Sequence, residues 1–527
     1  MKVTRRNFLG MTAGAGAYAL SPLNVQAQPA FLSLPEMEWP PNRPLPSFAR
    51  PVSLDAADVQ QLTSDQQVLM TTLQGIVNRR QPRIYLFLSG DNTDQTWLNT
   101  IEIPNTIATD PLSLVQKYRN EVSGAVVYDP NVPDTINLAT SLAGIMGGVA
   151  ASSDLAGQYQ YPVLLDLRGR FSDKFDAYNW LIDNYWPQLT PRLLTAISPG
   201  APNLRDYIVA TRSLVFWLDP EVPNEAALFA QILQKVAPNT PYLGWFANGN
   251  EDAGVQLCSQ NGVVVGAADY LNNATVLGGV GAAVRPFQPY APPPALENRI
   301  YLTLTMSDGD NLQYDEHRLR TIWDDPNRGK VPLNWSISPF LLDVAPAVLN
   351  YYQSTQTPND FLVAGPSGAG YTYPGDWPSA DLPIFTRRTG EYMDRTGMNV
   401  IYALNRLNGN NIDITEAVAQ DYASSTRLAG ILGNWVESKQ SGYVTTPAGL
   451  PVVTQVGIST VAQGQALLAA AAQSWNGASP RFIALGLLAW DMTPTDVITL
   501  ASSLGASYEV VRADVFFGLL RETLGLS

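Results

Sequence analysis

The sequence predicts an α/β protein with an N-terminal sheet domain followed by a TIM-like barrel. Three observations lead to this fold class. The chain has 527 residues, more than one hydrophobic core usually serves. Short apolar runs typical of buried strands alternate with helical stretches along most of it. From residue 299 to the end this alternation repeats eight times, and a barrel of eight β/α units typically takes about 250 residues.

Residues 1–27 have the pattern of a twin-arginine export signal. Thr4-Arg5-Arg6-Asn7-Phe8-Leu9 carries the two arginines, and a mildly apolar run follows. Val25-Gln26-Ala27 is a small-x-small cleavage site, and no acid precedes Glu36. The apolar run is shorter than the roughly 20 residues of a membrane span. We therefore expect cleavage after Ala27 and a bacterial protein in the periplasm or outside the cell, without a membrane anchor.

The N-terminal half begins with an extended strap at residues 28–51, which carry seven prolines. Residues 52–285 then alternate helices and strands. Ser64–Asn78 has the apolar stripe of a helix, and Arg83–Leu88 has the composition of a buried strand. Further alternation of this kind predicts a mostly parallel sheet flanked by helices. Five prolines within residues 286–298 mark a semi-rigid linker and the domain boundary.

The C-terminal domain, residues 299–527, contains eight strand-like runs separated by helical stretches. These runs lie near residues 300–306, 333–338, 361–364, 398–404, 428–433, 451–456, 482–489 and 508–512. A closed barrel fits this pattern best. An open doubly wound sheet is the alternative, because a miscount of one or two strands would make the patterns alike.

Composition excludes several classes of function. The net charge is −14, from 46 acidic and 32 basic residues, so we expect no nucleic-acid partner, whose phosphates require a basic surface. The single cysteine, Cys258, is expected to be a core residue, and a chain with one cysteine cannot form an internal disulfide. The single histidine, His317, excludes metal sites built from several histidines and reads as helical scaffold. Acid–base chemistry therefore falls mainly to carboxylates.

Polar and aromatic residues gather where the predicted barrel strands end, which is where barrel enzymes place their sites. Asp308, Asp310 and Asn311 follow the first strand, and Asn405 follows the fourth. Acids accompany tryptophans after two further strands, as Trp435 with Glu437 and Trp490 with Asp491. Indole faces pack against the C–H faces of sugar rings, while acids and amides bind hydroxyls. This combination indicates carbohydrate.

Two loops admit a second interpretation. Asp308-Gly309-Asp310-Asn311 could only cap the following helix, but two acids around a glycine exceed that need. Its oxygens could also accept Ca²⁺ or Mg²⁺, although we expect no metal or other cofactor. The glycine-rich loop Gly365–Gly370 lacks the Gly-Lys-Ser/Thr of a phosphate-binding loop. It is either a tight structural turn or a close approach of backbone to ligand.

Several of these motifs resemble one known family. Gly368-Ala369-Gly370-Tyr371-Thr372-Tyr373-Pro374 is similar to the signature of the GxGYxYP putative glycoside hydrolases. Ser307–Gln313 resembles the acidic motif of that family, Ala489–Met492 with Val510–Asp514 its closing segment, and Leu73–Leu86 its N-terminal domain. The resemblance implies an exported bacterial protein of two domains, with a barrel-like C-terminal domain and a sugar substrate.

We therefore expect an exported glycoside hydrolase that uses two carboxylates at the barrel's carboxyl rim. One is Asp308 or Asp310 and the other Glu437 or Asp491, with acid and base unassigned. A separation of ~5–5.5 Å would imply retention of configuration and ~6.5–9.5 Å inversion. The expected substrate-binding residues are Asn311, Ser367, Gly368, Gly370, Tyr371, Tyr373, Asn405, Trp435, Trp490, Arg512 and Asp514.

The alternative function is a non-catalytic glycan-binding protein with a degenerate barrel. The same aromatic and amide residues would serve it, but no acid would have a raised pKa. Metal-dependent deacetylation, which usually needs two histidines, does not fit a chain with one. The sugar, its linkage, the oligomeric state and the role of the N-terminal domain stay open.

Overall fold

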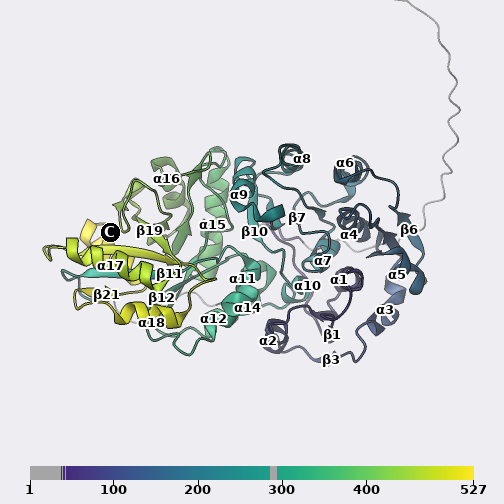
Figure 1. Cartoon of the computed structure of the whole chain (residues 1–527), viewed down its shortest axis with the longest axis horizontal. Coiled ribbons are helices and arrows are strands. Elements are labelled where there is room, and N and C mark those ends of the chain that lie inside the picture. The colour runs from purple at the N-terminus through teal and green to yellow at the C-terminus, as the bar shows by residue number, and fades with distance from the viewer. Residues whose placement is uncertain (1–36, 38, 42, 285–293, 527) are drawn as a thin grey trace, which may run out of the picture. The chain divides into compact units, whose positions relative to one another are not determined.

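The computed structural model describes Met37 and residues 39–41, 43–284 and 294–526 (Figure 1). The expected export signal lies outside the described residues, as does most of the linker at 286–298. Strands and helices alternate from β1 to α19, which confirms the α/β class. Within the described part of the chain, no helix is both long enough and apolar enough to cross a membrane.

The N-terminal half forms three small parallel sheets, where a single sheet was expected. The first has the order β2 (Ile84–Phe87), β1 (Leu54–Asp58), β3 (Asn105–Ile107), and the second β5 (Val149–Ala151), β4 (Ala125–Val127), β6 (Val163–Asp166). The third has the order β10 (Val264–Ala267), β9 (Pro241–Gly244), β7 (Leu194–Ala196), β8 (Leu214–Phe216). Alternating apolar runs do not reveal whether successive strands pair with one another. The number of sheets therefore could not be predicted from the sequence pattern.

Helices connect and separate these sheets. They are α1 (Ser64–Asn78), α2 (Thr93–Thr100), α3 (Ser113–Lys117), α4 (Thr135–Met146), α5 (Ser153–Gln158), α6 (Lys174–Tyr185), α7 (Arg205–Thr211), α8 (Pro223–Leu233), α9 (Glu251–Gln260) and α10 (Ala274–Leu277). α1 starts at a capping box, in which Thr63 and Gln66 bond each other's backbone N–H groups. α1, α4 and α7 contact one another and are largely buried between the sheets.

The described part of the proline-rich strap packs onto this half. Leu45 and Phe48 are buried, and the Phe48 ring lies 5.4 Å from that of Tyr207. The Arg192 guanidinium donates to the carbonyl oxygens of Trp39, Pro40 and Arg43 and lies 4.7 Å from the Trp39 ring centroid. Segments without their own secondary structure are thus fixed by one arginine and two apolar anchors.

The C-terminal half is a closed barrel of seven parallel strands within the described residues. In order around the barrel these are β11 (Ile300–Met306), β12 (Leu333–Ile337), β13 (Asp360–Ala364), β14 (Val400–Ala403), β17 (Gly430–Gly433), β19 (Val452–Ile458) and β20 (Arg481–Leu487). β20 returns to β11 along its whole length, and β11 pairs with β12 at Thr305↔Asn334 and Met306↔Trp335. Closure excludes the open doubly wound alternative.

The eighth predicted strand exists but is not one of the strands that form the closed barrel. β21 (Tyr508–Val510) pairs only with the first half of β11, from Ile300↔Tyr508 to Leu302↔Val510. Beyond it the chain turns into α19 (Ala513–Leu524), and the backbone N–H of Ala513 donates to Asn334 Oδ1 at 2.7 Å. The turn into α19 ends the strand before it reaches β12, so the prediction of eight barrel strands was wrong by one.

Helix α19 packs against the inward side chains of the barrel. Its Phe516, Phe517 and Leu520 form one apolar cluster with Tyr301, Phe361, Val363, Val400, Leu432, Val453, Phe482 and Ala484. Most of these residues are in the first half of their strands, so the helix fills the amino end of the barrel. The carboxyl ends of the strands form the other mouth of the barrel, which α19 does not fill.

The remaining helices of this half are α11 (Leu312–Glu316), α12 (Arg318–Trp323), α13 (Leu341–Val344), α14 (Pro346–Ser354), α15 (Leu382–Thr396), α16 (Glu416–Ser425), α17 (Val461–Ser474) and α18 (Pro494–Ser502). Two short pairings lie off the barrel: β15 (Arg406–Leu407) with β16 (Asn410–Asn411), and β18 (Val444–Thr445) with β19. The helix expected after Asn311 is present as α11 and α12, and its apolar residues Leu312, Leu319, Ile322 and Trp323 are buried.

Candidate active site

A pocket of about 380 Å³ opens at the carboxyl mouth of the barrel. Inward-facing strand residues line its depth: Tyr402, Gln455, Gly457 and Gly486. Strand ends and the loops after them supply Ser307, Asp308, Asp310, Pro366, Tyr371, Leu404, Arg406, Asn411, Asn434, Trp435, Leu487 and Leu488. One lining residue, Glu251, comes from outside the barrel, at the start of α9. The pocket is therefore shared between the barrel and the third N-terminal sheet.

Strand β10 of the third sheet joins the two loops that the sequence singled out. Val265 and Tyr371 exchange both backbone hydrogen bonds, at 3.2 and 2.7 Å, and Ala267 forms a bridge with Asn311. Gly370 allows this approach, because it has φ +113° and a Cβ there would lie 2.2 Å from Val264 Cγ1. The glycine of the signature is thus needed to seat the loop on β10, and the Tyr371 side chain is thereby directed to the pocket.

Asp308 is held in a left-handed backbone conformation, with φ +72°. Its Oδ1 accepts a hydrogen bond from the Ser307 hydroxyl at 3.0 Å. Its Oδ2 is buried and lacks a hydrogen bond of normal geometry to the described residues. Burial raises the pKa of Asp308 to about 6. The hydrogen bond from Ser307 acts to lower this pKa, whereas the nearby Glu251 carboxylate acts to raise it. Asp308 can therefore carry a proton near neutral pH.

Asp310 lies two residues further, on the same loop, and is almost fully buried. Burial raises the pKa of Asp310 well above its usual range, and the carboxylates of Asp308 and Glu251 raise it further. Like charges so close together cannot all be ionised in a desolvated site. The loop thus supplies two carboxyl groups that tend to retain protons.

Glu251 is the third acid of the pocket. Its Oε1 accepts a hydrogen bond from the Tyr371 hydroxyl at 2.7 Å. Burial raises the pKa of Glu251, while the Tyr371 hydrogen bond and the charge of Arg406 act in the opposite direction. Glu251 is the most exposed of the three acids, and the Tyr371 hydroxyl and the Arg406 guanidinium both favour its ionised form. The pocket can therefore hold a proton donor and a carboxylate together.

Tyr373, the second tyrosine of the signature, helps to hold α9, the helix that carries Glu251, in position. It is buried and is not part of the pocket lining. Its hydroxyl donates to Asp252 Oδ1 at 3.2 Å, and Arg406 lies 5.0 Å from its ring centroid while pairing with Asp252 at 2.6 Å. The barrel loop after β14 is thereby tied to α9, the helix that carries Glu251.

Four further predicted binding residues hold loops in place. Asn311 caps α11 by accepting from the Tyr314 backbone N–H at 3.0 Å. Ser367 is buried and its hydroxyl donates to Thr372 O at 2.9 Å, and Gly368 lies against Thr389. Asn405 is buried, accepting from Gly375 N and donating to Asp413 O. None of the four lines the pocket.

Of the two predicted rim tryptophans, Trp435 lines the pocket, whereas Trp490 is outside the lining but interacts with Asp308. Trp435 lines the pocket and is 43% exposed. Trp490 is exposed and packs edge-on against Tyr314, with the two ring centroids 5.8 Å apart. Its indole also interacts with the Asp308 carboxyl group, which favours ionised Asp308 and lowers the pKa of Asp308. Both indoles are accessible to a ligand that enters the mouth.

The other predicted acids lie elsewhere. Glu437 and Asp491 are exposed on the loops after β17 and β20 and are not part of the pocket lining. Arg512 and Asp514 form an ion pair of 2.7 Å, and Arg512 donates to Pro358 O at 2.6 Å, ahead of β13. That contact puts the pair at the amino end of the barrel, away from the mouth, where it anchors α19.

Residues that sequence reasoning missed are Glu251, Tyr402, Arg406 and Gln455. Glu251 precedes Asp308 by more than fifty residues and lies on helix α9, outside the barrel, so strand-end patterns within the barrel could not identify it. Tyr402 and Gln455 lie inside strands, where alternation alone does not tell inward from outward. Within the described residues, no three acidic, histidine or cysteine side chains form a group suited to a metal ion.

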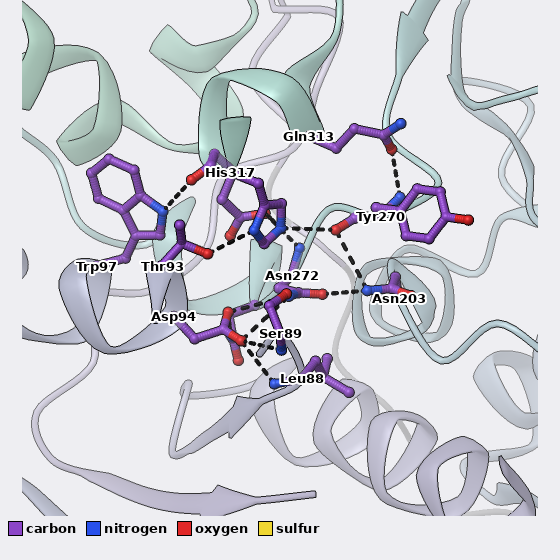
Figure 2. Close-up of polar contacts among 12 residues, drawn as sticks. Leu88, Ser89, Thr93, Asp94, Trp97, Asn203, Tyr270, Asn272, Gln313 and His317 are labelled. Atoms are coloured by element: carbon purple, nitrogen blue, oxygen red, sulfur yellow. Dashed lines mark hydrogen bonds and ion pairs between the residues drawn. The ribbon is translucent and has the colours of Figure 1, made fainter. Parts of the chain in front are cut away.

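Figure 2 shows a polar network centred on His317, at the junction of α11 and α12. His317 Nδ1 lies 2.6 Å from Thr93 Oγ1, and its Nε2 lies 3.2 Å from Tyr270 O and 3.3 Å from Glu316 Oε2. Burial lowers the pKa of His317, but the carboxylates of Glu316 and Asp91 outweigh it and hold the pKa well above its usual value.

The same network joins three parts of the chain (Figure 2). The Asn272 backbone N–H donates to Glu316 Oε2 at 2.8 Å, and the Asn272 amide donates to Asp94 Oδ1 at 3.2 Å. Burial raises the pKa of Glu316 to about 7. The contacts connect α2 of the first sheet, the loop after β10 of the third sheet, and α11. Because α11 directly follows Asp308–Asn311, the network supports the loop that carries two pocket acids.

The fold and the pocket define an α/β protein whose closed parallel barrel holds an acidic cavity at its carboxyl mouth. Family models match nearly the whole described chain: the GxGYxYP first, second and third N-terminal domains at residues 53–120, 122–189 and 191–279, and the GxGYxYP putative glycoside hydrolase C-terminal domain at residues 298–521. The chain belongs to the GxGYxYP family. The three N-terminal matches correspond to the three sheets, one to each.

A solved structure has the same fold. It is described as a putative hydrolase from Bacteroides thetaiotaomicron VPI-5482, with 23% sequence identity and a TM-score of 0.83. The match covers 94% of this chain and 99% of that one. No curated protein matches the sequence. The likeness to this structure shows that the two chains share a fold, and the family description names a putative glycoside hydrolase domain.

Proposed function

We propose that this protein hydrolyses glycosidic bonds with carboxyl groups at the mouth of the barrel. The observation that supports this is the meeting of Asp308, Asp310 and Glu251 at one pocket, all with pKa values raised by burial. Glycoside hydrolysis uses one protonated and one ionised carboxyl group on the two sides of the scissile bond. The expected partners Glu437 and Asp491 are replaced in this proposal by Glu251.

In the proposed reaction Asp308 is the general acid. Its raised pKa keeps a proton available near neutral pH, and the proton passes to the glycosidic oxygen as the bond to the anomeric carbon breaks. Glu251, oriented by the Tyr371 hydroxyl, acts from the other side as base toward water or as nucleophile. Water supplies the hydroxyl of the sugar product. Asp310, the most buried of the three, retains a proton and limits the negative charge of the site.

The remaining lining suits a sugar. Trp435 and Tyr402 offer ring faces, and Asn434, Gln455 and Arg406 offer hydrogen-bond donors for hydroxyl groups. The pocket volume of about 380 Å³ falls within the range of small-ligand sites. We propose that the reaction takes place after export and needs no cofactor.

The proposal is tested by a glycan-library hydrolysis screen with four proteins: wild type, Asp308→Asn, Glu251→Gln and Asp491→Asn. Wild type should cleave at least one glycan. Asp308→Asn and Glu251→Gln should lower kcat by about 10²–10⁴-fold while still binding the substrate, because each removes a proton-transfer or nucleophilic group. Asp491→Asn, which changes an exposed acid of the same rim, should keep wild-type activity.

Proton NMR of the first product then gives the anomeric configuration, and so distinguishes nucleophile from base for Glu251. Binding of glycans without cleavage of any of them would instead favour a glycan-binding protein. Full activity in Asp308→Asn would exclude the assigned acid.

A further inference from the structure

A second hollow lies next to the candidate site, on the outer side of the barrel wall. It has a volume of about 530 Å³ and lies between helix α17 and strands β19 and β20. Its wall is apolar, with Val456, Ile483 and Leu485 from the strands facing Leu468 and Ala471 from the helix. A hollow of this size is large enough for a small organic ligand.

The sequence of α17 accounts for the hollow. The helix carries four consecutive alanines, Ala469–Ala472, where a barrel helix usually presents large apolar side chains. Only Gly464 and Leu468 of its fourteen residues are buried, whereas eight of the fifteen residues of α15 are buried. Leu467 is 38% exposed on this side. Apolar surface left uncovered in this way is typical of a binding site.

Trp435 connects the hollow to the acidic pocket, because its indole lines both. Leu488, which lines the acidic pocket, is likewise exposed, at 39%. A molecule whose sugar occupies the acidic pocket could therefore extend across Trp435 onto apolar surface. The two cavities have different chemistry, since one is lined by three acids and the lining of the other contains none.

The charged residues of the second hollow are already engaged. Arg481 donates to Ala471 O and to Ser474 Oγ, both at 2.8 Å. Lys439 lies 4.0 Å from the Tyr443 ring centroid and 3.6 Å from an Asp413 carboxylate oxygen. The site thus offers apolar contact, and the ligand that fits it is neutral and apolar.

We infer that this hollow is a subsite for an apolar aglycone, so that the substrates are glycosides with an alkyl or aryl group on the anomeric oxygen. The inference rests on the proposed hydrolysis at the neighbouring pocket. The sugar binds among the acids, the glycosidic oxygen lies near Trp435, and the aglycone lies between α17 and the barrel wall.

The first test is calorimetric titration with 1-octanol, a probe that has no sugar and undergoes no reaction. Wild type should bind it saturably. Ala471→Phe, which fills the hollow, should weaken binding at least tenfold, and so should the second filling variant Ala470→Phe. Ala469→Phe lies on the same helix but is exposed and outside the lining, so it should bind like wild type. Thermal melts of all variants establish that they are folded.

The second test compares octyl and methyl glycosides of the sugar found in the library screen. Wild type should show a kcat/KM at least tenfold higher for the octyl glycoside, and Ala471→Phe should remove this preference while cleaving the methyl glycoside normally. Absence of octanol binding in a wild type that cleaves methyl glycosides overturns the subsite alone. Octanol binding that depends on Ala471, without cleavage of any glycoside, overturns the proposed hydrolysis and supports an apolar-ligand site.

Discussion

Tyr371 is the residue on which the charge state of the pocket depends most directly. Its hydroxyl stabilises ionised Glu251, the acid that comes from the N-terminal half. The sequence pointed to Tyr371 through its glycine-rich loop, and to Asp308, Asp310 and Trp435 through their positions after strands; all four line the pocket. It could not point to Glu251, because no local pattern relates the start of α9 to a barrel formed by later residues.

Replacing Tyr371 by Phe should move the acidic limb of the kcat/KM profile to higher pH. The hydrogen bond lowers the pKa of Glu251, so its loss raises that pKa, and more alkaline conditions are needed to ionise the base. A hydrogen bond to a charged group contributes about 1.5–3 kcal/mol, so the shift should be about one pH unit or more. The control is Tyr373→Phe, whose hydroxyl bonds Asp252 and lies 3.4 Å from the Tyr371 hydroxyl; it keeps the bond from Tyr371 to Glu251, so its acidic limb should move less. An acidic limb that does not move in Tyr371→Phe would contradict the role given to Glu251.

At the scale of elements, the sequence predicted strands and helices better than their pairing. The helix at Ser64–Asn78 and the helix after Asn311 were predicted from local patterns, and both are present. The seven-strand closure depends on where β21 ends, and the division into three sheets depends on how α1, α4 and α7 pack. These are contacts between distant segments, which periodicity does not encode.

The packing of α19 inside the barrel gives a stability prediction. A Cβ at Gly430 would lie 2.1 Å from Phe517 ring atoms, so Gly430→Ala forces the helix out of position. It should destabilise the protein by about 1–3 kcal/mol. Gly518→Ala, on the same helix with nothing within 4 Å of its Cβ, should instead be neutral or stabilise by up to ~1 kcal/mol. Thermal midpoints measure both changes, and equal midpoints for the two variants would refute this packing.

For the whole molecule, the His317 network should make stability depend on pH. The pKa of His317 is higher in the folded than in the unfolded protein, so protonated His317 stabilises the fold. This stabilisation is complete below the unfolded pKa of about 6.5. It is lost as the pH rises through the folded pKa. The folded pKa of Glu316 is about 7, so ionising it also costs stability as pH rises from its unfolded value. The Asp94 pKa, raised by burial, acts in the same direction, and the lowered Asp91 pKa matters only in strong acid.

Wild type should therefore lose more stability between pH 6 and pH 9 than the double variant Glu316→Gln, His317→Gln, by about 1–2 kcal/mol. Thermal midpoints across this range measure the difference. Because the variant retains the pocket acids, their own titration cancels in the comparison. Parallel curves for the two proteins would show that the network does not couple the halves of the chain through its charge.

In the proposed reaction Asp308 donates the proton in glycoside cleavage, and the leaving-group dependence of Asp308→Asn measures this role most directly. Two glycosides of the same sugar are compared, one with an alkyl alcohol as leaving group and one with nitrophenol. We predict a loss in kcat/KM of about 10²–10⁴-fold for the alkyl glycoside. The nitrophenyl glycoside, whose leaving group needs no proton, should lose far less. Equal losses for both substrates would contradict the assignment of Asp308 as the acid.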